Sequence, residues 1–271
     1  MGLVCFGEHR FDAKLVSFDK DGTLFDFNAS WRRPFLQAVD NLLSPFSNRT
    51  RIRAALCRAL GFDAVAGSFN EDGPFAADTS EATVCTAATV LHQLSNPPLP
   101  WHECEELVRR RFAPILAGPV DLSPVTDLAA LFSSLQENCV RVAVITSDDS
   151  GPTEAALARF HLSRFVDFVA CGDGAIRHKP APDPLLAAAK AVGVSMAETV
   201  VVGDAVADLR MARSAGAGLA VGVLTGVGTR SKLGPLADLI LDSVAEIRVD
   251  FSPYGEQPPA PDHSSDRPGE P

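Results

Sequence analysis

The chain has 271 residues, of which 46% are hydrophobic, and its formal net charge is −10. This length allows one large domain or two small ones with a sizeable core. The acidity argues against a general nucleic-acid-binding or anionic-membrane-binding surface, because both need basic patches.

The six cysteines are scattered along the chain, and no pair has Cys-x-x-Cys spacing. We therefore expect reduced thiols and no zinc site. No apolar run reaches about 18 residues, and the first residues lack the basic start and apolar run of a signal peptide. These features predict a cytoplasmic protein that binds neither nucleic acid nor a membrane, and they predict no particular oligomeric state.

The first part of the chain predicts one strand followed by a helical block. Residues 14–18, "KLVSF", resemble a short buried strand, and after residue 24 the apolar residues recur at helical spacing. We expect residues 28–117 to form an all-helical cap domain with no strand. Its predicted helices lie in segments 31–46, 50–62, 80–94 and 101–116, with starts at Ser30, Asn48 or Thr50, Thr79 or Ser80, and Pro100.

Strands and helices then alternate, which predicts an α/β fold with a Rossmann-like, doubly wound parallel sheet. We expect the core domain to comprise residues 1–27 and 118–250. The tail from 251 to 271 is rich in proline and is predicted to be disordered. The expected strands lie in 140–146, 165–171, 199–204, 219–226 and 237–243, and the expected helices lie in 123–138, 151–162, 181–193 and 206–217, before a last short helical piece.

Polar side chains follow four of the predicted strands. Each alone could be a helix N-cap or a solvated surface residue. Because the carboxyl ends of parallel strands meet at one crevice, their occurrence at four strand ends favours a common site. They are Asp19 and Asp21, Thr146 and Ser147, Lys179, and Asp204 and Asp208.

This set of residue types suits phosphoryl transfer. Carboxylates can bind Mg²⁺, which relieves their mutual repulsion, and a free carboxylate can attack phosphorus. A lysine and hydroxyl groups can hold the phosphoryl oxygens as charge spreads over them. Gly22 allows a tight turn that presents backbone N–H groups to a phosphate.

The sequence also resembles a known superfamily. "DKDGTL", "VITSDD", "HKPAPDP" and "VVVGDAVADLRMARSAGA" are similar, in order, to the four motifs of the haloacid dehalogenase-like (HAD) hydrolases. The resemblance covers roughly residues 14–245, and its first and fourth motifs are the specific ones.

The resemblance implies a role for each matching residue. Asp19 matches the nucleophile, and Asp21 matches the general acid/base. Thr146 and Lys179 match the phosphate-binding hydroxyl and the neutralising lysine, which also belong to the catalytic set. The implied phosphate-binding residues are Gly22, Thr146, Ser147 and Lys179.

The resemblance also implies a Mg²⁺ cofactor. Its ligands would be Asp19, Asp204 and the backbone carbonyl of Asp21. Asp208 matches a second acid that is more often a supporting residue than a direct ligand.

The acid at position 21 separates the subclasses of the superfamily. Haloacid dehalogenases lack it and P-type ATPases carry Thr there, whereas phosphatases and phosphomutases carry Asp. The helical block resembles the cap of phosphoglycolate phosphatase and β-phosphoglucomutase relatives, which implies a small phosphorylated metabolite as partner. Segments 25–31 and 67–79 are candidates for contacts with it, and Arg32, Arg33 and Arg53 could reach an anionic substrate.

The leading hypothesis is therefore a Mg²⁺-dependent phosphatase that hydrolyses a small phosphate monoester through an aspartyl phosphate. A phosphomutase acting on a sugar phosphate shares the same motifs. A receiver-like phosphoacceptor domain that does not turn over is a third possibility, although such a domain needs only about 120 residues and no helical insert. A non-catalytic binding protein is disfavoured, because no catalytic residue is missing.

Overall fold

The computed structural model describes residues 3–116, 118 and 120–250. Its main feature is a six-stranded sheet in the order β10-β9-β8-β3-β6-β7, in which every neighbouring pair is parallel. The predicted parallel α/β core is therefore confirmed. The strands are β3 (Leu15–Phe18), β6 (Arg141–Ile145), β7 (Phe168–Ala170), β8 (Thr199–Gly203), β9 (Leu219–Val223) and β10 (Leu239–Leu241).

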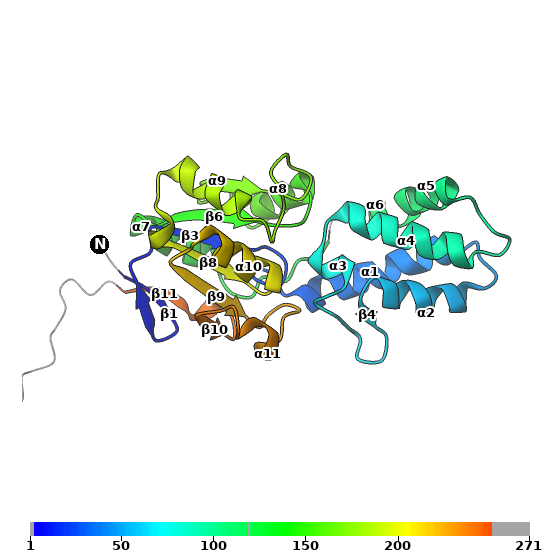
Figure 1. Cartoon of the computed structure of the whole chain (residues 1–271), viewed down its shortest axis with the longest axis horizontal. Coiled ribbons are helices and arrows are strands. Elements are labelled where there is room, and N and C mark those ends of the chain that lie inside the picture. The colour runs from blue at the N-terminus through cyan, green and yellow to red at the C-terminus, as the bar shows by residue number, and fades with distance from the viewer. Residues whose placement is uncertain (1–2, 117, 119, 251–271) are drawn as a thin grey trace, which may run out of the picture.

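Helices cover both faces of this sheet (Figure 1). Successive residues of a strand point to opposite faces. Val16 packs with the apolar residues of α7 and α8, whereas Leu15 packs with those of α9 and α10. The central strands are buried on both faces, which explains their nearly continuous apolar sequence. The helices are α7 (Leu128–Glu137), α8 (Ser150–Arg159), α9 (Asp183–Val192), α10 (Val206–Ala215) and α11 (Arg230–Leu233), with 3₁₀ turns at Met196–Glu198 and Val244–Glu246.

A second, antiparallel sheet of three short strands was not expected. It has the order β11-β1-β2 and comprises β1 (Leu3–Phe6), β2 (His9–Phe11) and β11 (Ile247–Asp250). Val4 and Phe6 of β1 join the apolar core on one face of the main sheet. These strands mix residues of different burial over three or four positions, so they lack the continuous burial that marks β3.

The segment between β3 and β6 is mostly helical, as predicted, but it is not all-helical. A two-stranded hairpin of β4 (Phe62–Asp63) and β5 (Ser68–Phe69) lies within it, with Phe62 paired to Phe69. Strands of two residues carry no periodic signal, so the sequence could not predict them. The helices are α1 (Phe27–Leu43), α2 (Arg49–Ala59), α3 (Pro74–Ala77), α4 (Ser80–Leu94), α5 (Trp101–Arg111) and α6 (Ala113–Leu116).

The predicted helix starts agree with the structure except at α1. Asn48, Thr79 and Pro100 are the N-caps of α2, α4 and α5. Helix α1 instead begins after Asp26, whose carboxylate accepts from the backbone N–H of residue 29. The predicted start, Ser30, is buried within the helix, where its hydroxyl oxygen accepts from the backbone N–H of residue 123.

The helical segment has its own apolar core, which is largely separate from the two apolar cores on the faces of the main sheet. Phe35 lies at its centre, fully buried, with its ring centroid 4.9 Å from that of Phe75 and 5.1 Å from that of Phe69. The domain limits at residues 28 and 117 stay a prediction. The tail expected to be disordered, 251–271, lies outside the described residues. Within the described part of the chain, no helix is long and apolar enough to cross a membrane.

We predict that Phe35→Ala lowers the free energy of unfolding by about 3–5 kcal/mol, because it removes a buried aromatic ring and leaves a cavity. Phe35→Leu keeps most of the volume and should cost less. Urea unfolding followed by circular dichroism measures both. A loss below about 1 kcal/mol for Phe35→Ala would contradict this description of the core.

Candidate active site

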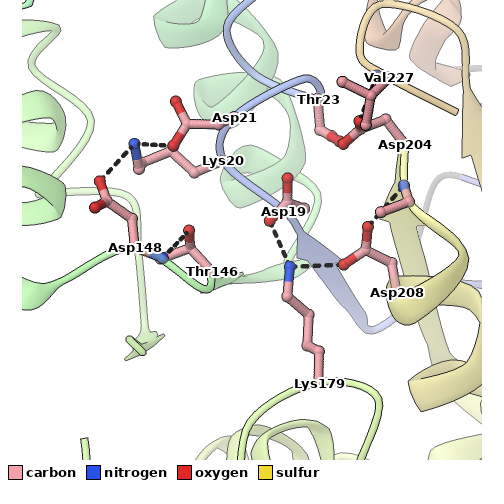
Figure 2. Close-up of polar contacts among 11 residues, drawn as sticks. Asp19, Lys20, Asp21, Thr23, Thr146, Asp148, Lys179, Asp204, Asp208 and Val227 are labelled. Carbon is pink, nitrogen blue, oxygen red and sulfur yellow. Dashed lines mark hydrogen bonds and ion pairs between the residues drawn. The ribbon is translucent and has the colours of Figure 1, made fainter. Parts of the chain in front are cut away.

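The predicted site residues lie at the carboxyl edge of the main sheet. Asp19 follows β3, Thr146 follows β6 and Asp204 follows β8, while Lys179 lies in the loop between β7 and α9. Figure 2 shows their side chains meeting from separate elements. All of the predicted side chains line one cavity of about 150 Å³ between the sheet and the helical segment, namely Asp19, Asp21, Thr146, Ser147, Lys179, Asp204 and Asp208.

The centre of the site is the buried ammonium of Lys179. It donates to Asp19 Oδ1 at 2.6 Å and to Asp208 Oδ1 at 2.7 Å. Burial alone lowers the pKa of Lys179, but the two carboxylates together raise it above its ordinary value. The lysine therefore stays charged and fixes the position of Asp19.

The acids of the cluster outnumber this single ammonium. Burial, partly opposed by Lys179, raises the pKa of Asp19 to about 6. Burial and the carboxylates of Asp19 and Asp208 raise the pKa of Asp204 well above its usual range. Asp204 accepts from the backbone N–H of Val227 at 3.0 Å and from the Thr23 hydroxyl at 3.2 Å. Among the described residues no cation forms an ion pair with it.

This donor set fits a divalent cation. One carboxylate oxygen from each of Asp19, Asp204 and Asp208 lies within 4.8 Å of the others, and all three residues are buried. Three acids and one ammonium leave an excess of negative charge that burial makes costly. Oxygen ligands of this kind suit Mg²⁺. The site thus has both the charge and the chemistry for such an ion.

Two glycines make room for the carboxylate of Asp204. A Cβ at Gly22 or at Gly226 would overlap it. Gly22 also has φ +94°, a conformation that side chains rarely adopt. Gly22 therefore makes room for Asp204, and the Thr225 hydroxyl donates to its carbonyl at 2.7 Å. The predicted phosphate contact is not supported, because the Gly22 N–H donates to the carbonyl of Phe25 at 2.7 Å and Gly22 does not line the cavity.

Asp21 lies apart from the acid cluster. Its carboxylate pairs with Lys20, as Figure 2 shows. It also accepts from the indole N–H of Trp31 at 2.9 Å. The predicted metal ligands were Asp19, Asp21 and Asp204. In the structure the third carboxylate of the cluster belongs to Asp208 instead of Asp21. A role for Asp21 as a metal ligand rests on its backbone carbonyl alone and stays a prediction.

Lys20 and Asp148 had no predicted role, and Trp31 was predicted only as part of the segment 25–31 that contacts substrate. Lys20 is 1% exposed and its ammonium lies 3.0 Å from Asp148 Oδ2. This ion pair links the ends of β3 and β6, and within the loop after β6 the backbone N–H of Asp148 donates to the Thr146 hydroxyl at 3.1 Å. The signal was a lysine between two acids in "DKDGTL", followed by a further acid pair in "TSDD".

The helical segment supplies the other wall of the cavity. The two segments expected to contact substrate both contribute, through Phe27 and Trp31 and through residues 75–78. The three arginines that could have reached an anionic substrate do not line the cavity, which agrees with the alternative that arginines on a helix are solvated surface residues. Arg32 and Arg33 line a separate hollow, and Arg53 pairs with Asp40 on the surface.

Comparison with known proteins agrees with this geometry. The sequence model of the family described as "haloacid dehalogenase-like hydrolase" matches residues 13–216. The chain is 30% identical over 234 residues to "Probable phosphatase IndB" of Dickeya dadantii, covering 86% of this chain and 91% of that protein. It is 30% identical to CbbY of Cereibacter sphaeroides, covering 86% and 93% of the two chains.

Solved structures share the fold. A predicted phosphoglycolate phosphatase from Haemophilus somnus superposes with a TM-score of 0.63 at 17% identity, covering 87% of this chain and 96% of that one. CbbY from Rhodobacter sphaeroides, solved with phosphate, gives 0.58 at 22% identity, covering 86% and 96%. The four motifs, the fold and the family match together identify the chain as a haloacid dehalogenase-like hydrolase.

Proposed function

We propose that the chain is a Mg²⁺-dependent phosphatase that hydrolyses a small-molecule phosphate monoester through an aspartyl phosphate on Asp19. The observation that carries the proposal is the contact of Lys179 with Asp19 inside a buried acid cluster that opens onto a cavity. Curated relatives that carry the name of a phosphatase support the same chemistry.

Asp19 is the proposed nucleophile. One of its carboxylate oxygens attacks phosphorus as the bond to the leaving oxygen breaks, and Asp21 gives that oxygen a proton. Asp21 then takes a proton from the water that attacks phosphorus, so that inorganic phosphate leaves and Asp19 is restored. Lys179 holds Asp19 in its ionised form and offsets charge on the phosphoryl oxygens, to which Thr146 and Ser147 donate.

Asp19, Asp204 and the backbone carbonyl of Asp21 would hold Mg²⁺, with Asp208 as the supporting acid. The bound ion supplies charge neutralisation for the cluster and for the substrate phosphate. Lys20 and Trp31 keep the Asp21 carboxylate out of the acid cluster, so that it can exchange protons rather than bind the ion.

A hydrolytic role is preferred to a receiver-like role for two reasons. The matching family is one of hydrolases, and the helical segment walls the cavity opposite Asp19. A receiver domain has no such wall. A small cavity walled on both sides suits a small metabolite better than a phosphorylated protein.

We predict that Asp19→Asn abolishes phosphatase activity while leaving the fold intact, because shape is kept and the attacking oxygen is lost. Release of phosphate from 4-nitrophenyl phosphate measures this. Asp121→Asn is the matched control, since it removes the same charge from a side chain that is 97% exposed and distant from the cavity. Hydrolysis by Asp19→Asn at the parent rate would refute the assigned role.

We predict that Mg²⁺ raises the melting temperature of the parent protein, because it binds the folded acid cluster and not the unfolded chain. Asp204→Asn should lose most of this effect, and EDTA should reverse it while stopping hydrolysis. Differential scanning fluorimetry with and without Mg²⁺ provides a readout independent of activity. An equal shift in the parent and the variant would exclude Asp204 as a ligand.

We predict that Mg²⁺ affinity falls as the pH drops below about 6. The pKa of Asp19 is raised to about 6, so below that pH a proton occupies the carboxylate and must be displaced by the ion. Displacement of one proton weakens binding up to about tenfold per pH unit. Calorimetric titrations at pH 5.0 and 7.5 measure this, and equal affinities at the two pH values would contradict it.

A further inference from the structure

The wall of the cavity that faces the acid cluster is mostly apolar. Helices α1, α3, α4 and α6 and the residue after α5 contribute its side chains. The large ones are Phe27, Trp31, Phe75, Val84, Phe112 and Leu116. A substrate whose phosphate contacts Asp19 and Lys179 would place its organic part against this wall.

The aromatic part of the wall is fixed in place. The ring of Phe75 lies edge-on to Trp31 at 6.0 Å and to Phe27 at 6.2 Å, while it stacks on Phe69 at 4.9 Å. Such packing leaves little freedom for these rings to turn away. The apolar surface is therefore built into the structure and is present before a substrate enters.

The wall offers few hydrogen-bond donors. The indole N–H of Trp31 already donates to Asp21, and the Thr83 hydroxyl already donates to the backbone carbonyl of Pro74 at 3.5 Å. A sugar would set several hydroxyls against this apolar wall, whose other polar side chains are Asp78 and Ser80, and hydroxyls that face the apolar side chains would be buried at a cost.

The charge of the lining also disfavours a second anion. Among the described residues that line the cavity are seven aspartates and a single cation, Lys179, which is already shared by Asp19 and Asp208. A carboxylate at the far end of a substrate would meet no cation there. It would also be repelled by Asp78, which lines the cavity on the helical side.

We propose that the site selects phosphate monoesters whose organic part is uncharged and largely apolar, aromatic or aliphatic. It discriminates against esters that carry a carboxylate, such as phosphoglycolate, and against sugar phosphates. This inference rests on the proposed phosphatase function.

The experiment compares kcat/KM for ethyl, butyl and hexyl phosphate, phenyl phosphate, phosphoglycolate and glucose 6-phosphate. We expect kcat/KM to rise up to about fourfold for each methylene that reaches the wall, as expected for burial of a methylene group. Phosphoglycolate and glucose 6-phosphate should fall at least tenfold below butyl phosphate.

A matched pair of variants locates the preference. Val84→Thr places a hydroxyl in the wall at nearly constant volume and should reduce the hexyl-to-ethyl ratio of kcat/KM about threefold or more. Val90→Thr is the control, because Val90 lies on the same helix but outside this cavity and should leave the ratio unchanged.

The outcomes separate this inference from the proposed function. A flat alkyl series, or a preference for phosphoglycolate or glucose 6-phosphate, would overturn the inference while phosphatase activity stands. Equal ratios in Val84→Thr and in the parent would overturn the assignment of the wall. If none of the esters, including 4-nitrophenyl phosphate, were hydrolysed with Mg²⁺, the proposed function would fall and the inference with it.

Discussion

The ion pairs of Lys179 are the interaction on which the site depends. One ammonium holds Asp19, which follows β3, and Asp208, which lies in the first turn of α10. Without this charge, three carboxylates would be buried together with no cation in contact, which is strongly unfavourable in a protein interior. The parallel sheet makes the arrangement possible, because its strand ends bring distant segments of the chain to one edge.

Much of the core and of the site could be predicted from the sequence. The buried strands are nearly continuous apolar runs, and helix α4 matches its predicted segment at both ends. The side chains that follow these strands meet because the carboxyl ends of parallel strands lie at the same edge of the sheet. The strands β1, β2, β4, β5 and β11 were not predicted, since they mix residues of different burial over two to four positions, whereas the similarly short β3 is buried throughout.

The remaining differences depend on contacts between segments distant in sequence. Ser30 has the chemistry of an N-cap, yet its hydroxyl oxygen serves the backbone at residue 123 while Asp26 caps the helix. Lys20 pairs with Asp148 only because β3 lies beside β6. The direction in which Arg32 points depends on how its helix packs, which helical spacing alone does not determine.

The hydrogen bond from Trp31 to Asp21 joins the two halves of the molecule at the reacting centre. The indole belongs to the first helix of the helical segment, and the acid belongs to the loop after β3. A hinge motion that withdrew the helices would break this bond and leave Lys20 as the remaining side-chain partner of Asp21. In the proposed mechanism, the orientation of the acid would then depend on whether the helical segment lies against the sheet.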